Sequence, residues 1–177
     1  MLNINSDEVR VRSMKREDLE IVLSWRNDPK IRQFMYTQNE IKVSDHEKWF
    51  ENAIKDRKRH LLIYEEQFSP LGFVNFTETG NCKVADWGFY TAPSAAPGTG
   101  RSLGHTALAY AFKDLMYHKV CGQALAFNHK SIKFHHALGF KQEGVLRDQF
   151  LSGDNFVDIF CFGLISNEFE SLVLQRG

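Results

Sequence analysis

The sequence contains a glycine-dense turn, APGTGRSLG, over residues 96–104, directly before a run with helical periodicity. Glycines let successive backbone N–H groups approach a ligand without side-chain obstruction, and the first N–H groups of a helix are unpaired and carry partial positive charge. Such a turn can bind a phosphate or pyrophosphate. The spacing of Gly98, Gly100 and Gly104 is GxGxxxG with no Lys-Ser or Lys-Thr after it, which disfavours both a Walker A loop and the dinucleotide fingerprint.

A second segment that could do chemistry is NHKSIKFHHALGF, residues 128–140. Helical spacing of i, i+3, i+4 and i+7 places four of its residues on one face: Ser131, Phe134, His135 and Leu138. His135 is therefore predicted to point inward. A histidine can give up a proton near neutral pH, so His135 is either a general acid or a partly buried histidine that only packs.

The apolar pattern predicts the elements that position these two segments. Strands are expected at residues 8–14, 60–66, 71–79, 83–91, 119–127, 140–150 and 155–165, and helices at 15–28, 44–54, 101–117 and 129–139. Ser44 and Glu47 form a capping-box pattern at the start of the second helix. This order predicts an α+β, mixed α/β fold with a mostly antiparallel sheet of about seven strands and about four flanking helices.

Length and composition indicate one globular domain over residues 1–177, with 43% hydrophobic residues and balanced charges of 22 basic and 22 acidic side chains. A neutral chain gives no general attraction to nucleic acid. Cys82, Cys121 and Cys161 lack CxxC spacing, so we expect reduced, buried thiols and no metal site. No leader or apolar run of about 18 residues is visible, so no membrane partner and a cytoplasmic location are expected.

Together, PGTGRS and N..S..FH...GF resemble the two central motifs of the GNAT superfamily of acetyl-coenzyme A-dependent N-acetyltransferases, and the element order matches over nearly the whole chain. Two departures are Pro97, where the family usually has Gln or Arg, and Ser102, where it has Gly or Ala. The third is His135, at the position of a tyrosine that protonates the leaving thiolate. The resemblance implies acetyl-CoA as the donor and coenzyme A as a product.

The resemblance also implies which residues contact each ligand. The cofactor-binding set is Phe89, Tyr90, Thr91, Gly98, Thr99, Gly100, Arg101, Ser102, Leu103, Gly104, Asn128 and Ser131. The acceptor-binding set is Arg26, Met35, Tyr36, His46, Trp49, Thr77 and Tyr90. A ring-bearing, anionic acceptor needs aromatic or thioether walls and a few cationic or polar anchors, which these residue types supply. The catalytic candidates are His135 and Glu78, with metal-free chemistry.

The segments LSWRNDPKIRQFMYT, SDHEKWF, GFVNFTET and WGFYTAP look like the GNAT branch that acetylates the 4-amino group of a UDP-linked 4-amino-4,6-dideoxy sugar. That branch serves pseudaminic acid biosynthesis and flagellin glycosylation. A neighbouring branch, which acetylates the N-termini of ribosomal proteins, shares a similar opening, so a protein Nα-acetyltransferase stays open. So does a non-catalytic acyl-CoA-binding sensor. A homodimer also stays open.

The expected mechanism is direct attack of a neutral amine on the thioester in a ternary complex. Acetyl-CoA is expected along the splay between residues 87–91 and 123–127, with backbone N–H groups near Phe89 to Thr91 polarising the carbonyl. The proton is expected to leave through water to Glu78, Asp86 or His46, and His135 is expected to protonate the thiolate.

Overall fold

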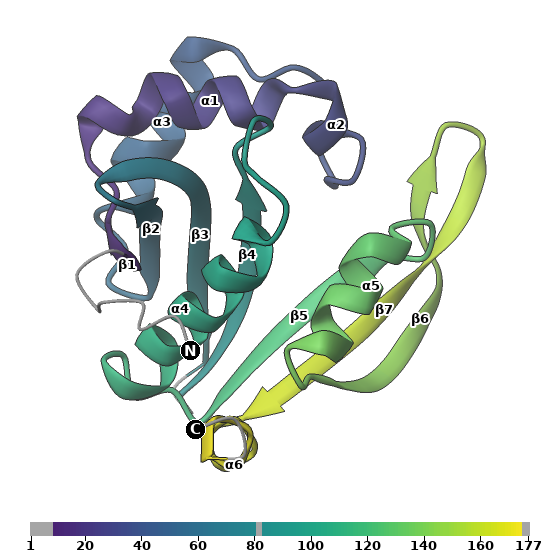
Figure 1. Cartoon of the computed structure of the whole chain (residues 1–177). Helices are drawn as coiled ribbons and strands as arrows, with labels where there is room; N and C mark the ends of the chain where they lie inside the picture. Colours follow the sequence, from purple (N-terminus) through teal and green to yellow (C-terminus); the bar gives the residue numbers. More distant parts are fainter. Residues whose placement is uncertain (1–8, 81–82, 175–177) are drawn as a thin grey trace. The chain divides into compact units, whose positions relative to one another are not determined.

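The computed structural model describes residues 9–80 and 83–174. Its strands are β1 (Val9–Ser13), β2 (Arg59–Glu66), β3 (Ser69–Thr79), β4 (Val84–Thr91), β5 (Lys119–Leu125), β6 (Lys141–Ser152) and β7 (Asn155–Ile165). Its helices are η1, a 3-10 turn (Arg16–Asp18), α1 (Leu19–Asn27), α2 (Pro29–Arg32), α3 (Val43–Ala53), α4 (Thr99–Lys113), α5 (His129–Ala137) and α6 (Ser166–Leu174). Figure 1 shows this order along the chain.

The seven strands are hydrogen-bonded in the order β1-β2-β3-β4-β5-β7-β6. β2 pairs antiparallel with β1 and β3, β7 pairs antiparallel with β5 and β6, and β4 pairs parallel with β5. The predicted mixed α/β fold with a mostly antiparallel sheet is confirmed. The chain divides into two compact units, Met1–Thr77 with Gly88–Tyr110 and Glu78–Trp87 with Ala111–Gly177.

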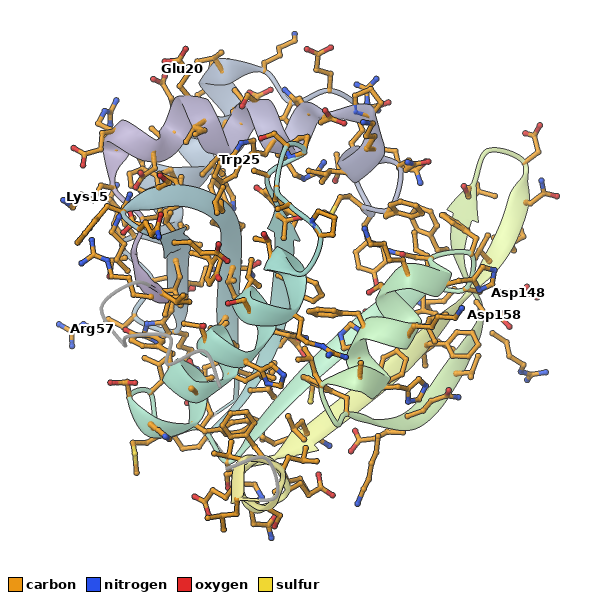
Figure 2. All side chains as sticks on the ribbon, in the orientation of Figure 1. Lys15, Glu20, Trp25, Arg57, Asp148 and Asp158 are labelled. Atoms are coloured by element: carbon orange, nitrogen blue, oxygen red, sulfur yellow. The ribbon has the colours of Figure 1, made fainter. Side chains whose placement is uncertain are left out.

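The first unit has its hydrophobic core between the helices α1 and α3 and the strands β2 and β3. Representative core residues are Val22, Trp25, Phe50, Ile63 and Phe73. Figure 2 shows Trp25 beneath α1 and Glu20 on its outer side, and the exposures agree, because Trp25 is buried and Glu20 is exposed. This division is typical of an amphipathic helix, whose apolar side faces the core.

An ion-pair network fixes the beginning of this unit. Arg12 on β1 donates from Nε to Glu65 Oε1 at 2.7 Å and from Nη1 and Nη2 to the Asp18 carboxylate at 2.7 and 2.8 Å. Asp18 also accepts from the backbone N–H of Lys15 at 2.7 Å. Since Asp18 and Glu65 are both buried, the fork of Arg12 supplies the partners that their carboxylates need and ties β1 to β2 and to the start of α1.

Helix α4 approaches β3 very closely at Gly72. A Cβ at that position would lie 2.4 Å from Leu103 Cδ1 and 3.0 Å from the carbonyl oxygen of Tyr90. Ser102, the residue before Leu103, is also held by β2. The Tyr64 hydroxyl donates to Glu66 Oε1 and is hydrogen-bonded to Ser102 Oγ, at 2.6 Å each. Because neighbouring strand residues face opposite ways, α4 covers the face of β3 opposite to the core side of Phe73.

The second unit is built around β5, which lies between β4 and β7. Helix α5 lies along β5 and β7 in Figure 1, and α6 begins where β7 ends. The β6–β7 hairpin contains a bulge between Leu146 and Phe150, where the backbone N–H of Asp148 donates to Asp158 Oδ1 at 2.9 Å. Figure 2 shows Asp148 and Asp158 together on this hairpin.

Some expectations about the elements need correction. Six α-helices lie within the described residues, because α2 and α6 were not expected. Helix α3 begins at Val43, with Lys42 as N-cap, so Ser44 does not cap it. Cys121 and Cys161 are half-buried rather than buried, and Cys82 lies outside the described residues. No helix in residues 9–80 or 83–174 is long and apolar enough to cross a membrane.

Gly72→Ala is expected to lower the free energy of unfolding by about 1–3 kcal/mol, because the added methyl group collides with the buried Leu103 side chain. Gly144→Ala is the matched control, since a Cβ there meets nothing within 4 Å and its backbone is unstrained. Urea denaturation of both variants measures the difference. Equal stability of the two variants would contradict the close packing of α4 on β3.

Candidate functional site

The glycine turn leads into α4 and presents open backbone amides. Gly98 has a φ of +100°, which favours glycine, and a Cβ there would meet nothing within 4 Å. The N–H groups of Arg101 and Ser102 both donate to the carbonyl of Gly98, at 2.9 and 3.2 Å. Among the described residues none accepts from the N–H groups of Gly98 and Gly100. These two N–H groups and the exposed side chain of Arg101 are thus available to an anion.

The predicted cofactor residues at this turn differ in how their amides are bonded. Helix α4 begins at Thr99 rather than near Arg101. Only the first four N–H groups of a helix lack a partner within it, so the amides of Leu103 and Gly104 fall inside the hydrogen-bonded helix. Leu103 and Gly104 are also buried, and the Ser102 hydroxyl is engaged by Tyr64. These three residues position the helix, and their predicted contacts with the cofactor stay predictions.

Four aromatic rings and one cation gather on the core side of the first unit. His46 stacks on Trp49 with ring centroids 5.0 Å apart, Trp49 meets Phe73 edge-on at 6.1 Å, and Phe73 lies 5.2 Å from Tyr90. The guanidinium of Arg26 lies close enough to influence both His46 and Tyr90 electrostatically. We call Arg26, His46, Trp49, Phe73 and Tyr90 the acceptor cluster.

Arg26 has an unusual bonding state. Its Nη2 donates to the carbonyl of Thr37 at 2.8 Å, whereas its Nη1 is buried and has no hydrogen-bond partner. None of the ion pairs formed by the described residues includes Arg26. Burial lowers the pKa of Arg26, but a guanidinium remains charged at neutral pH. The side chain therefore offers a charged donor without an acceptor.

The same surroundings set the protonation of the neighbouring groups. Burial, and then the positive charge of Arg26, lower the pKa of His46, so its imidazole is neutral at pH 7. Burial raises the pKa of Tyr90, so its phenol keeps its proton. The acceptor cluster thus combines one permanent cation with neutral aromatic groups.

The structure brings together only part of the predicted acceptor set. Arg26, His46, Trp49 and Tyr90 belong to the acceptor cluster, whereas Met35 is half-buried and Tyr36 is 53% exposed on the segment after α2. Thr77 is half-buried farther along β3, and Phe89 and Thr91 are half-buried on β4.

Sequence reasoning missed Phe73, although its place in the alternating run GFVNFT was a usable signal. A cavity of about 220 Å³ in the first unit, between Met14, Ile54 and Leu61, contains none of the predicted residues.

In the second unit, His135 is 1% exposed and both of its ring nitrogens are occupied. Nδ1 lies 2.8 Å from the carbonyl oxygen of Ser131 and so carries the proton, and Nε2 accepts from the indole N–H of Trp87 at 3.2 Å. The ring also stacks on Phe162 at 4.7 Å. Burial lowers the pKa of His135 to about 4. A proton on Nε2 would also point at the indole N–H of Trp87, so two donors would face each other.

This geometry does not support the predicted general-acid role of His135. A general acid must reach the atom that it protonates, and here the only ring proton is already donated to Ser131. The inward orientation was predicted correctly, and the alternative that His135 packs is the better account. Gly122 permits the arrangement, since a Cβ there would lie 2.4 Å from His135 Nε2 and 2.7 Å from Trp87 Nε1.

Asn128 and Ser131 have local structural roles. The side chain of Asn128 caps α5 by accepting from the N–H of Ser131 at 3.1 Å, and the Ser131 carbonyl then binds His135. The spacing of asparagine, serine and histidine therefore satisfies the first turn of a helix and orders its buried ring. Their predicted contacts with the cofactor stay predictions.

Glu78 and Asp86 are the carboxylate candidates for proton transfer. Side chains alternate along a strand, so Glu78 of β3 points away from the face that carries Phe73. Asp86 lies on β4, two residues before Gly88. Burial raises the pKa of Asp86, although the residue as a whole is exposed. The roles of Glu78 and Asp86 in proton transfer stay predictions.

His135→Gln tests the role of this histidine. Because the folded state has the lower pKa, its contribution to stability is complete above pH 6.5 and is lost as the pH falls toward 4. Between pH 7.5 and 5, the free energy of unfolding should fall by about 2 kcal/mol more in the original protein than in His135→Gln.

Urea titrations at both pH values measure this difference, with the exposed His129→Gln as control. At pH 7.5 turnover of the folded variant should stay within about threefold, whereas a general acid would cost about 100-fold or more. A loss of that size with unchanged folding would restore the general-acid role.

Comparison with known proteins agrees with these observations. The family model described as an acetyltransferase (GNAT) domain matches residues 8–141. A prophage-derived N-acetyltransferase of Bacillus subtilis, YokL, is 25% identical over 169 residues, covering 93% of each chain. Acetyltransferase PseH of Campylobacter jejuni is 28% identical over 125 residues, covering 69% of this chain and 76% of that protein.

The fold is also that of a solved acetyltransferase. The crystal structure of spermidine N-acetyltransferase from Vibrio cholerae in complex with CoA and spermine superimposes with a TM-score of 0.86 at 21% identity, covering 93% of this chain and 99% of that one. The open glycine turn before α4, the strand order and the family match lead to one conclusion. The chain belongs to the GNAT family of acetyltransferases, enzymes that use acetyl-CoA as the acetyl donor.

Proposed function

We propose that this chain acetylates the 4-amino group of a UDP-linked 4-amino-4,6-dideoxy-N-acetyl-hexose, acting as a single GNAT domain in the cytoplasm. The observation that carries the proposal is Arg26, whose buried Nη1 has no partner and which lies beside a cluster of aromatic rings. A nucleotide sugar offers phosphate oxygens for the guanidinium and flat rings for the aromatic side chains.

The same observation argues against a polyamine, the acceptor named for the structural neighbour from Vibrio cholerae. A polyamine is a flexible cation and needs carboxylates, whereas the charged member of the acceptor cluster is itself a cation. A peptide N-terminus is also cationic and is disfavoured for the same reason. Likeness to PseH of Campylobacter jejuni and the sequence resemblance to the sugar-nucleotide branch support this choice.

The glycine turn fits the pyrophosphate of acetyl-CoA. Gly98 leaves the approach open, Gly100 offers a free N–H, and Arg101 adds an exposed cation at the positive end of α4. When bound, acetyl-CoA supplies the acetyl group as a thioester. Arg26 would hold and orient the acceptor while Trp49 and Tyr90 exclude water from its ring.

The chain must also remove a proton from the amine. Asp86 is a carboxylate on β4 whose pKa is raised by burial, and His46 is a neutral imidazole that can accept a proton at pH 7. Either group could act through a water molecule. Asp86 is our first choice because no hydrogen bond or ion pair in the described residues engages its carboxylate.

We also propose that two copies associate. β6 is an edge strand of the sheet, and the hairpin that it forms with β7 exposes apolar side chains, with Leu146 42%, Leu151 55% and Phe156 65% exposed. An edge strand with exposed apolar residues is suited to pairing with a second chain.

Arg26→Gln is expected to raise the KM for the UDP-amino sugar by about 10-fold to 100-fold, because a charge-assisted hydrogen bond is lost. Steady-state coenzyme A release with a panel of UDP-amino sugars, spermidine and short peptides measures it. Lys30→Gln is the control, since it removes one cation from the exposed surface of α2. Turnover of spermidine or peptides alone would overturn the proposal, and turnover of nothing would favour a non-catalytic sensor.

Asp86→Asn is expected to lower kcat by about 100-fold and to remove the rise of kcat with pH that reports the base. Glu78→Gln, which alters a carboxylate on the face of β3 opposite to Phe73, should cost far less. Initial rates from pH 5 to 9 compare the two. If Asp86→Asn keeps its kcat while His46→Gln loses it, the base is His46.

A further inference from the structure

The face of β3 that carries Phe73 also carries the polar side chain of Asn75, which the acceptor cluster does not include. Asn75 lies between Phe73 and Thr77 in sequence alternation, so the three side chains share a face of the strand. Phe73 is part of the acceptor cluster through its contact with Tyr90. The amide group of Asn75 is therefore located next to the ring of Phe73 on the same face of β3.

Gly88 on β4 leaves room for this amide. A Cβ at position 88 would lie 2.6 Å from Asn75 Oδ1 and 3.8 Å from Nδ2, so the side chain of Asn75 rests over the glycine. Gly88 and Tyr90 are two residues apart and point to the same face. Any side chain at position 88 would displace the amide from its place over the glycine.

The amide of Asn75 is free to bind a ligand. Within the described residues no group hydrogen-bonds with its side chain. Asn75 is half-buried, and neither of its amide atoms is among the buried polar atoms without a partner, so both remain accessible. A polar side chain held in an apolar setting with its hydrogen-bonding capacity unused is suited to a polar group of a ligand.

We propose that Asn75 is a specificity-determining residue that hydrogen-bonds the reacting amine of the acceptor, an inference that rests on the proposed function. Oδ1 accepts from the N–H of the amine. A neutral amide orients the nitrogen without stabilising its ammonium form, whereas a carboxylate at this position would favour the ammonium, which cannot attack a thioester. Asparagine thus both selects the amine and keeps it reactive.

The test compares Asn75→Leu and Asn75→Asp with the exposed helix variant Asn52→Leu as control. Acceptor KM, kcat and the pH dependence of kcat are measured by coenzyme A release, and acceptor affinity by calorimetry in the presence of coenzyme A. Asn75→Leu should weaken acceptor binding at least about 10-fold and leave the Kd of acetyl-CoA within about twofold. Asn75→Asp should move the acidic limb of the kcat profile upward by about one pH unit.

Gly88→Ala should reproduce the loss of Asn75→Leu while both variants keep cooperative unfolding. Unchanged acceptor affinity in Asn75→Leu, or an unmoved pH profile in Asn75→Asp, would overturn this inference even if the UDP-amino sugar is the substrate. If the original protein acetylates a different class of amine, the proposed function fails and the Asn75 variants are judged with that amine. If it acetylates none, both fail.

Discussion

The first unit depends on the close contact between α4 and β3 at Gly72. The side chain of Leu103 fills the space where a Cβ would otherwise stand, so the helix can lie directly against the strand. The bond between Tyr64 and Ser102 then fixes the helix about its axis near its first turn. Phe73 follows Gly72 and points to the opposite face of β3. These two adjacent residues therefore set how closely α4 and the glycine turn lie against β3, and they position one aromatic ring of the acceptor cluster.

The order of the elements was predictable because periodicity depends on burial, which is a property of each segment and its face. The boundaries were less predictable. Helix α3 begins at Val43 without using Ser44 as a cap, and α4 begins at Thr99, because local hydrogen bonds decide where a helix starts. α2 was missed because four residues are too short to show a helical period.

The candidate site was predictable in part. Residue types such as Arg26 and Trp49 indicated an anionic, ring-bearing ligand, but which aromatic rings meet depends on pairing between distant strands, and so Phe73 and Asn75 were missed. His135 shows the opposite error. Its inward direction followed from helical spacing, whereas its role depended on Trp87, which is 48 residues away in sequence and occupies the second ring nitrogen.

The unpaired Nη1 of Arg26 has a thermodynamic consequence for the free protein. A buried donor without an acceptor costs about 1–3 kcal/mol, and the fold retains that cost whenever the site holds no acceptor. A ligand that supplies an oxygen there removes the cost, so part of its binding free energy returns to the protein as stability. Folding of the first unit and occupation of its acceptor cluster are therefore linked equilibria, joined at a single nitrogen atom.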